Sequence, residues 1–285
     1  MNIQNKIDFA VILNVNNANP NGDPLNGNRP RTAGGYLGEI SDVCLKRKIR
    51  NRWLDMGQGI FVQSDDNSVD GYKSLKQRAD GELKAEQKDE VKFREYACKK
   101  WMDVRAFGQV FAFKADKKAT DDNKGVSIGI RGPVSLHPAF SVVPVNITST
   151  QITKSVSSEG DGDKRGSDTM GMKHRVDHGV YVFYGSINPQ LATKTGFSEQ
   201  DAVMLKDALT KLFENDASSA RPEGSMEVHK VYWWKHNCAS GQYSSAKVHR
   251  TLSVTAKVEE PNGIADYEIR HSVLDGLFPD VLDGF

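Results

Sequence analysis

The segment IDFAVILNV, residues 7–15, is the clearest strand signal in the chain, and the fold prediction starts from it. Successive side chains of a strand point to opposite faces. Ala10 and Ile12 supply apolar side chains to one face. The other face receives Ile7, Phe9, Val11, Leu13 and Val15. The segment therefore predicts a mostly buried strand.

An Asn-rich stretch, NVNNANPNGDPLNGNRPRT (residues 14–32), continues from this strand. Asn, Gly and Pro are the residues that turns require. Structureless loops of more than about 12–15 residues are usually functional or disordered. The one acid of the stretch, Asp23, occupies a position where it could act in catalysis. A structural role of Asp23 in an Asx turn is the favoured interpretation.

Residues 39–54, EISDVCLKRKIRNRWL, contain neither Pro nor Gly and predict a helix. Lys46 and Arg50 are four positions apart and therefore share one edge of this helix. Residues 29–52 carry seven basic side chains, whereas residues 259–285 carry seven acids and one Arg. This asymmetry suits a nucleic-acid groove on one face and a partner contact on another. Ordinary solvated surface charge is the alternative for either segment.

The middle of the chain predicts an insertion, further strands and a hairpin. Residues 56–104 predict a polar, partly helical, finger-like insertion, and RAFGQVFAF (105–113) predicts a second strand. Residues 126–145 are rich in β-forming residues. Two strand-like runs flank a polar, Gly-rich tip at 157–168 and predict a long β-hairpin, whose projecting part spans 147–177.

The last third completes an α+β pattern. Residues 198–213 predict a helix that Ser198 caps, and 226–234 and 248–258 predict strands before an acidic C-terminal tail at 259–285. Without the insertions the order is strand, helix, strand, strand, helix, strand. This βαββαβ order is that of ferredoxin-like folds, which RNA-recognition motifs (RRM) also use. We therefore expect residues 1–285 to form one elaborated RRM-like domain.

Composition limits the class of protein. The chain has 285 residues with a net charge of +1, 26% charged and 38% hydrophobic residues. No run approaches the ~20 apolar residues that a membrane-spanning helix needs, and the N-terminus lacks a signal-peptide pattern. The three cysteines are widely separated and form no CxxC pair. We expect a cytoplasmic protein with no disulfide framework, no zinc knuckle and no membrane partner.

The usual signatures of catalysis and cofactor binding are missing from the sequence. It contains no G-x-x-x-x-G-K-[ST] loop, no G-x-G-x-x-G fingerprint and no G-x-S-x-G turn. A zinc site in KHRVDHG (173–179) fails on geometry, because His174 and His178 would lie roughly 13 Å apart along a strand. We predict no catalytic residue, metal or cofactor. Phosphate contacts by Lys173, His174 and Arg175 are more plausible, with a solvated hairpin edge as the alternative.

RAFGQVFAF agrees in part with the RNA-recognition consensus K/R-G-F/Y-G/A-F-V-x-F/Y. Arg105, Phe107, Gly108 and Val110 fit it. A base could stack on Phe107 while Arg105 holds a phosphate, since stacking contributes ~1–3 kcal/mol per base whatever the sequence. A core strand with buried Phe side chains is the competing interpretation.

Four stretches together resemble one family over nearly the whole chain. They are FAVILNVNNANPNGDPLNGNRPRT, WMDVRAFGQVF, IRGPVSLHPAFSVVPVNITSTQITKS and MGMKHRVDHGVYVFYGSINP. They are similar to the CRISPR-associated backbone subunit of type I-C Cascade complexes, of the repeat-associated mysterious protein superfamily. The insertion at 56–104 and the acidic tail are the least diagnostic parts.

The resemblance implies a non-catalytic antiviral-defence protein that binds CRISPR RNA and forms a head-to-tail filament of copies along it. The ribonucleoprotein would contain other type I-C Cascade subunits and would present the guide for pairing with target DNA. The resemblance also implies that the hairpin at 147–177 is a thumb that displaces one base at a fixed interval, with Met170 and Met172 as candidate wedges. Guide-backbone contacts are implied for six residues: Arg29, Arg31, Lys46, Arg50, Arg105 and Arg131.

Two other functions remain open from the sequence. The first is an RNA endonuclease that uses Asp23, because related backbone subunits of type III complexes cut RNA with an Asp in a comparable loop. The second is a generic ferredoxin-like interaction module that binds no nucleic acid.

Overall fold

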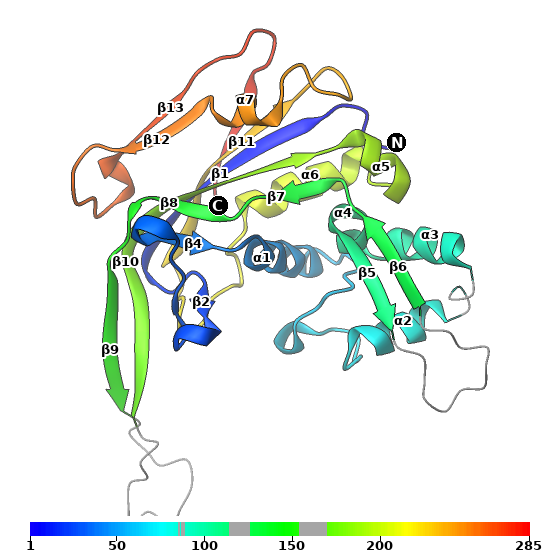
Figure 1. The fold of residues 1–285 in the computed structure, drawn as a ribbon, viewed down its shortest axis with the longest axis horizontal. Coiled ribbons are helices and arrows are strands. Elements are labelled where there is room, and N and C mark those ends of the chain that lie inside the picture. Colours follow the sequence, from blue (N-terminus) through cyan, green and yellow to red (C-terminus); the bar gives the residue numbers. More distant parts are fainter. Residues whose placement is uncertain (85, 87–88, 114–125, 154–169) are drawn as a thin grey trace, which may run out of the picture.

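The computed structural model describes residues 1–84, 86, 89–113, 126–153 and 170–285. Within these ranges the fold combines a large antiparallel sheet with several helices (Figure 1). A search of the described helices for a long apolar segment that could span a membrane finds none.

The main sheet contains eight described strands. Six of them lie side by side in the order β14–β11–β1–β10–β8–β4, and β7 and β9 also pair with β10. Every pair is antiparallel. The strands are β1 (Ile7–Ala18), β4 (Leu37–Ile40), β7 (Val134–Leu136), β8 (Ala139–Pro144), β9 (Ile147–Thr153), β10 (Met170–Ile187), β11 (Met226–Lys235) and β14 (Pro279–Asp283).

The predicted first strand is confirmed as β1, which lies inside the sheet between β10 and β11. Every side chain from residue 7 to residue 15 is buried. The strand continues to Ala18, so the first residues of the Asn-rich stretch belong to the sheet and not to a loop. The apolar face with Phe9 and Val11 packs on helices, and the face with Ala10 and Ile12 packs on the C-terminal segment.

Helices cover one face of the sheet and C-terminal elements cover the other (Figure 1). The first face carries α1 (Asp42–Asp55), α5 (Pro189–Thr195) and α6 (Glu199–Thr210). The predicted cap of α6 is confirmed as a reciprocal capping box between Ser198 and Asp201. The second face carries α7 (Ser245–His249), β12 (Leu252–Ala256) and β13 (Tyr267–His271), which follows the 3-10 turn Ile264–Asp266.

Helix α1 begins three residues later than residues 39–54 predict. Residues Leu37–Ile40 pair with β8 as β4, which commits their backbone groups to the sheet. Ser41 then caps the helix, and its hydroxyl accepts a hydrogen bond from the Cys44 amide at 3.3 Å. A polar side chain that satisfies a free N–H group fixes the start of a helix at this position.

The predicted strand at 105–113 is wrong in its first half. Residues Met102–Phe107 form helix α4, and only Gly108–Phe113 form a strand, β5. Gly108 divides them with a φ of 80°, a conformation that ends the helix and that only glycine adopts readily. Strand β5 pairs with β6 (Val126–Arg131) in a separate two-stranded sheet, so it is not part of the main sheet.

The predicted strand at 248–258 is also wrong in its first part, because Ser244 caps helix α7 there. Strand β12 begins only at Leu252. The acidic segment 259–285 contributes β13, which pairs with β12, and β14, which pairs with β11.

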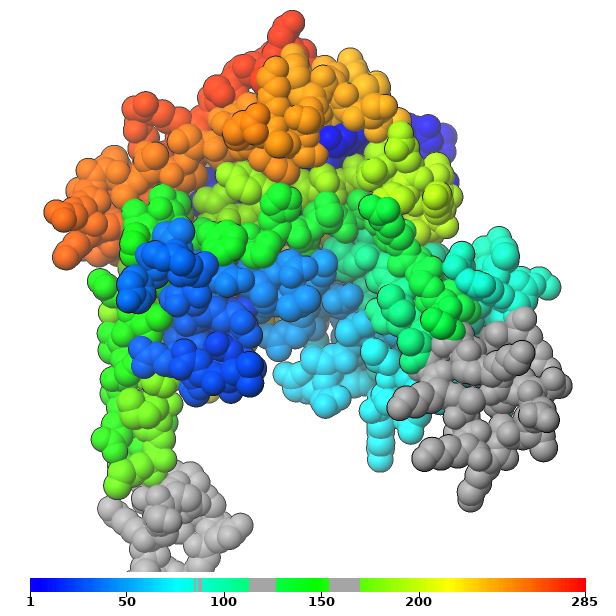
Figure 2. All heavy atoms as spheres, in the orientation of Figure 1, coloured from blue at the N-terminus to red at the C-terminus, as the bar shows by residue number. Residues whose placement is uncertain are grey.

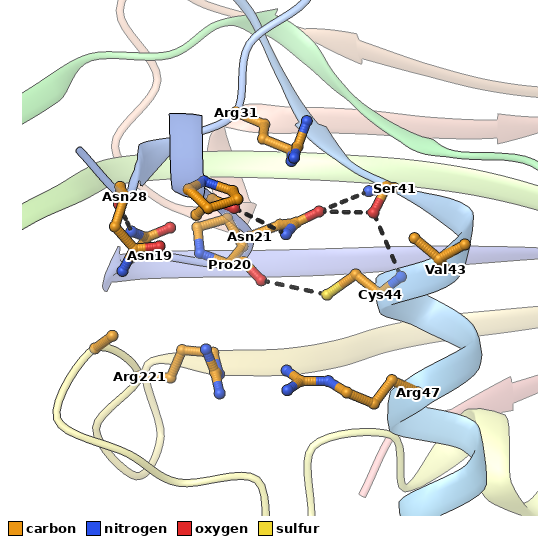
Figure 3. Close-up of a pocket in the computed structure, with 13 residues that line it drawn as sticks. Asn19, Pro20, Asn21, Asn28, Arg31, Ser41, Val43, Cys44, Arg47 and Arg221 are labelled. Carbon is orange, nitrogen blue, oxygen red and sulfur yellow. Dashed lines mark hydrogen bonds between the residues drawn. The ribbon is translucent and has the colours of Figure 1, made fainter. Parts of the chain in front are cut away.

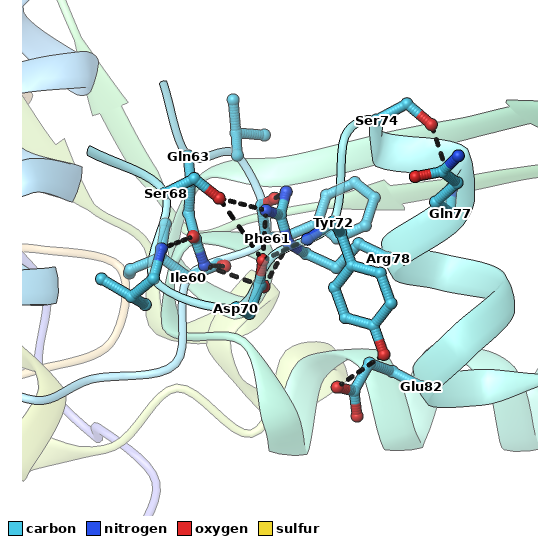
Figure 4. A network of polar contacts seen from close by, with 12 residues as sticks. Ile60, Phe61, Gln63, Ser68, Asp70, Tyr72, Ser74, Gln77, Arg78 and Glu82 are labelled. Carbon is cyan, nitrogen blue, oxygen red and sulfur yellow. Dashed lines mark hydrogen bonds and ion pairs between the residues drawn. The ribbon is translucent and has the colours of Figure 1, made fainter. Parts of the chain in front are cut away.

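Residues 60–130 contain a second hydrophobic core beside the first. It joins α2 (Leu75–Leu83), α3 (Glu90–Lys100) and α4 to β5 and β6, so it reaches beyond residue 104 to Phe111 and Ile128. Figure 4 shows the polar network that holds the loop before α2. The buried Arg78 guanidinium donates to the Asp70 carboxylate and to the Phe61 carbonyl oxygen at 2.8 Å.

The predicted β-hairpin is confirmed where the structure describes it. Strand β9 pairs with residues 170–176 of β10, from Val176↔Ile147 to Met170↔Thr153. The side chains of its outer part are exposed on both strands. The predicted tip at 157–168 lies outside the described residues.

Candidate nucleic-acid interface

The Asn-rich loop is folded into defined turns. Strands β2 (Gly22–Asp23) and β3 (Arg29–Pro30) pair around the 3-10 turn Pro24–Asn26. Asp23 accepts a hydrogen bond from the Leu25 amide at 3.2 Å, which is the Asx-type turn role that the sequence favours. The loop therefore presents its side chains from a fixed backbone.

Asn21 attaches this loop to the start of α1 (Figure 3). Its side-chain oxygen accepts hydrogen bonds from the Ser41 amide at 3.0 Å and from the Ser41 hydroxyl at 2.9 Å. The Cys44 thiol also lies 3.9 Å from the carbonyl oxygen of Pro20. Loop and helix thus form one continuous wall.

A surface pocket of about 480 Å³ lies between this wall and the segment at residues 220–221. Arginines from three different segments line it: Arg31, Arg47 and Arg221. In Figure 3, Arg47 extends from α1 toward Arg221, and Arg31 lies on the other side of the loop. Guanidinium groups bind phosphate oxygens with paired N–H donors.

The three arginines differ in how strongly the protein already binds them. Arg31 lies 3.5 Å from the Asp23 carboxylate, and Arg221 donates from Nε to Asp216 at 3.0 Å. Arg47 is exposed and makes no hydrogen bond or ion pair with any residue that the structure describes. The Arg47 guanidinium is therefore the most available of the three for an external anion.

Lys48 fixes the far wall of the pocket. Its side chain is fully buried and pairs with the Asp216 carboxylate, which also holds Arg221. Burial lowers the pKa of Lys48 from its usual 10.5, while the carboxylate of Asp216 acts in the opposite direction. This shared carboxylate connects α1 to the loop that carries Arg221.

Three predicted RNA contacts gather around one aromatic pair. Phe107 stacks on Trp53, with ring centroids 5.3 Å apart. Arg50 Cζ lies 5.3 Å and Lys46 Nζ lies 5.9 Å from the centroid of Phe107. Because Trp53 and these cations already contact the Phe107 ring, it offers a base less surface than the predicted strand would.

Arg50 and Arg105 are bound to carboxylates inside the protein. Arg50 donates from Nε to Asp103 at 2.9 Å. Arg105 binds both carboxylate oxygens of Asp201, at 3.1 and 2.7 Å. Their guanidinium groups connect structural elements, and this use competes with the predicted phosphate contact. Lys46 forms only a half-buried pair with Asp42, at 2.9 Å on its own helix.

The hairpin separates the predicted residues 170–175 onto two faces. Alternation along β10 puts Met170, Met172 and His174 on one face, and Lys173 and Arg175 on the other. Met170 and Met172 are 64% and 54% exposed, so neither belongs to the core. The sequence groups Lys173, His174 and Arg175 together, but the strand does not.

Arg29 and His174 meet at the base of the hairpin. Arg29 donates to the Ser149 hydroxyl at 3.0 Å, and His174 Nδ1 lies 2.8 Å from the same oxygen. Arg175 pairs with Asp177 at 3.4 Å on the other face. Arg131 is exposed at the end of β6, opposite Gly108.

Figure 2 shows a hollow in the surface between the Asn-rich loop, in dark blue, and the start of the predicted insertion at 56–104, in cyan. The hairpin projects on the outer side of the loop. The pocket arginines, the Lys46 edge of α1 and the methionine face of the hairpin are therefore carried by neighbouring elements. In the described part of the chain, no group of three or more His, Cys, Asp or Glu side chains could hold a metal ion.

Sequence reasoning missed two residues of the pocket. Arg47 lies in the basic run of α1, but the family resemblance implies contacts by Lys46 and Arg50 instead. Treating every basic residue of the run as a candidate would have included Arg47. Arg221 follows α6 and has no local signal, because only the fold brings it to α1.

Comparisons with known proteins identify one family. The profile of the family described as "CRISPR-associated protein Cas7" matches residues 5–272. A "CRISPR-associated protein Cas7" of Haloferax volcanii is 28% identical over 230 residues, which cover 77% of this chain and 67% of that protein. One solved chain, from a "CRISPR RNA-guided surveillance complex, pre-nicking", aligns with 80% of this chain and 78% of its own length, at 14% identity and a TM-score of 0.46.

A chain from a second "CRISPR RNA-guided surveillance complex" aligns over 80% of this chain and 68% of its own length, at 15% identity and a TM-score of 0.41. The family assignment rests on the sequence matches alone. Because the family profile spans nearly the whole chain, the chain belongs to the Cas7 family of CRISPR-associated proteins.

Proposed function

We propose that this chain is a non-catalytic backbone subunit of a type I-C interference complex in the cytoplasm. It binds CRISPR RNA, oligomerises head to tail along it and joins other Cascade subunits. Base pairing by the guide then selects the target DNA, so the protein itself needs contacts that do not depend on sequence.

We further propose that the centre of the fold is an RRM-like core. Elements β1, α1, β8, β10, α6 and β11 follow one another in βαββαβ order. Their strands lie in the order β11–β1–β10–β8, so the two strands next to each other at the centre are the first and third of the four. This interleaved arrangement supports the split βαβ interpretation.

The convergence of Arg31, Arg47 and Arg221 on one pocket is the observation that carries the proposal. The three residues are distant in sequence, and no described carboxylate pairs with Arg47. Asp23 lies near Arg31 and Asp216 pairs with Arg221, so the Arg47 guanidinium is the one that has no described carboxylate within ion-pair distance and is available to an external anion. A phosphate backbone supplies that anion without any requirement on base sequence.

The hairpin supports a role as the thumb. A two-stranded ribbon exposed on both faces gains little stability by itself. An external surface that covers the exposed Met170 and Met172 side chains would supply what the ribbon lacks. We assign these methionines to the face of a displaced guide base.

The non-catalytic assignment rests on Asp23. Its carboxylate accepts the Leu25 amide and lies 3.5 Å from Arg31, so its oxygens already serve the loop. The alternative, endonuclease cleavage through Asp23, is tested by incubating the assembled complex with complementary RNA and Mg²⁺. Regularly spaced products that disappear in Asp23→Ala would establish the nuclease and overturn our assignment.

The proposal is tested by the RNA that copurifies with the complex. We expect an Arg47→Ala/Arg221→Ala double variant to lose most of the nuclease-protected guide RNA and to assemble poorly. The matched control is Lys92→Ala/Arg270→Ala, which removes the same charge from α3 and β13, where both side chains are exposed. Equal RNA retention in both double variants would refute the assignment of the pocket.

A further inference from the structure

An exposed tyrosine, Tyr36, occupies a strained backbone position between the Asn-rich loop and the hairpin. Tyr36 has a φ of 62°, in the left-handed region that tyrosine rarely adopts. Its side chain is 78% exposed. A residue of this kind is held in such a conformation only when the surrounding structure requires it, and such positions cluster at functional sites.

The backbone around Tyr36 is fixed on both sides. Thr32 pairs with Gly38, and the Ala33 amide donates to the Leu37 carbonyl oxygen at 2.8 Å, which closes a short loop. Gly38 is buried against Tyr181, where a Cβ atom would lie 2.1 Å from the tyrosine oxygen. The backbone at Tyr36 is therefore held in place before any ligand binds, and it directs the ring to the surface.

The short loop that Thr32 and Gly38 close also connects the Asn-rich loop to the hairpin. The carbonyl oxygen of Tyr36 accepts a hydrogen bond from the Val145 amide at 3.1 Å, two residues before the hairpin strand β9. At the other end of this loop, the Arg31 carbonyl oxygen accepts a hydrogen bond from the Glu39 amide at 2.9 Å. Tyr36 thus lies between a pocket arginine and the base of the hairpin.

The surroundings of the ring suit a flat partner. Gly34 and Gly35 precede it and carry no side chain, so they leave space beside the ring. No ring or cation of the described residues contacts the Tyr36 ring, unlike Phe107. Single-stranded nucleic acids are bound by basic residues along the backbone together with free aromatic rings on which bases stack.

We propose that Tyr36 is a base-stacking residue for the single-stranded RNA that binds along the loop and the hairpin. The inference rests on the proposed function, because it names a further contact within the same interface. A contact with another copy of the chain fits less well, since the loop offers a single ring between glycines and not a continuous apolar patch. The ring adds an attraction that does not depend on base sequence.

Substitution by glycine separates function from folding. Tyr36→Gly removes the ring and also relieves the left-handed backbone, so we expect an unchanged or higher melting temperature. In fluorescence anisotropy with a labelled RNA of about 12 nucleotides, we expect affinity to fall about tenfold. Tyr36→Phe keeps the ring and should bind like the native chain. Phe278→Ala, which removes a 68% exposed ring next to β14, is the control for loss of an exposed aromatic.

The same RNA with abasic sites identifies the partner of the ring. If Tyr36 stacks on a base, the native chain should lose affinity for the abasic RNA, and Tyr36→Gly should bind it as well as the native chain does. A difference that persists on abasic RNA, or equal affinities for the normal RNA, would overturn the inference. If Tyr36→Gly binds RNA normally but forms smaller assemblies, the ring belongs to a contact between copies. If neither the native chain nor the Arg47→Ala/Arg221→Ala variant binds RNA, the proposed function itself fails.

Discussion

Arg50 donates from Nε to the Asp103 carboxylate at 2.9 Å, and this contact joins helix α1 to helix α4. Asp103 is 1% exposed and also accepts the Phe61 and Val62 amides at 2.7 and 3.0 Å. A buried carboxylate that serves three donors depends on the one positive charge among them. Arg50 therefore stabilises the fold, whatever it also contributes to RNA binding.

We expect Arg50→Ala to lower the free energy of unfolding by about 3–5 kcal/mol, because it leaves the buried Asp103 carboxylate without its positively charged partner. Urea denaturation followed by circular dichroism measures this loss. Arg50→Ala/Asp103→Asn should recover part of it, since the amide carries no charge. An Arg50→Ala variant as stable as the native chain would contradict the structural role.

We expect a similar loss of stability when the ion pair between Arg105 and Asp201 is weakened, and this loss should depend on the paired geometry of the contact. Asp201 is 5% exposed, belongs to the α6 capping box and binds Arg105 through both oxygens. Arg105→Lys keeps the charge but cannot form the paired contact, so it should still destabilise the protein, by about 1–2 kcal/mol. Arg105→Ala should cost more, and the melting temperatures of the two variants give the order. Equal melting temperatures for Arg105→Lys and the native chain would show that the paired geometry has no importance.

Arg47 gives the opposite expectation, because its exposed guanidinium forms no hydrogen bond or ion pair with a residue that the structure describes. Arg47→Ala should leave the melting temperature unchanged and weaken RNA binding. If Arg47 contacts a phosphate, the slope of log affinity against log salt concentration should fall by about 0.7 for a single strand. The exposed Lys92→Ala on α3 should leave this slope unchanged. An identical slope in Arg47→Ala would remove this residue from the interface.

Four histidines, of which His249 is buried and the others are partly buried, lead us to expect a loss of stability in mild acid. Burial lowers the pKa of His249, His271, His178 and His229 from the usual 6.5. The unfolded chain therefore binds more protons than the folded chain just below pH 6.5, and the free energy of unfolding falls as the pH falls through this range. Urea midpoints between about pH 7.5 and 5.5 measure the effect. His249→Gln should reduce the pH dependence, and a midpoint that rises on acidification would contradict the expectation.

Local patterns were sufficient for several of the helices and strands but not for the interface. The alternation in residues 7–15, the Ser198 capping signal and the two runs of the hairpin each depend on neighbouring residues, and each prediction is confirmed. The strand prediction for RAFGQVFAF failed because the left-handed Gly108 ends a helix inside it. Apolar periodicity in so short a run does not distinguish a helix end from a strand.

The candidate site was harder to predict because availability of a basic side chain depends on its tertiary partners. Arg47 and Arg50 lie on the same helix, yet only Arg50 meets a buried carboxylate. Arg105 fits an RNA-binding consensus, but the fold gives it Asp201 as a partner. Such pairings join residues that are far apart in sequence, so no local motif reveals them.

The two faces of the hairpin give the last prediction. Arg29 contacts Ser149, and Ser149 is the cross-strand partner of His174, so the basic loop continues onto the face with Met170 and Met172. We expect the guide to follow this face, because it is the one joined to the loop. Met170→Ala/Met172→Ala should weaken RNA binding about three- to tenfold, as expected when sulfur–aromatic contacts with a base are lost.

The opposite face of the hairpin provides the control. Thr150 and Ile152 of β9 lie there opposite Lys173 and Gly171, and Ile152 is 48% exposed. Thr150→Ala/Ile152→Ala removes a comparable exposed surface from the same ribbon and should bind RNA like the native chain. If both double variants weaken binding equally, the guide does not distinguish the two faces. If only the Thr150/Ile152 variant does so, the guide lies on the face with Lys173 and Arg175, and the assignment of the methionines as wedges is wrong.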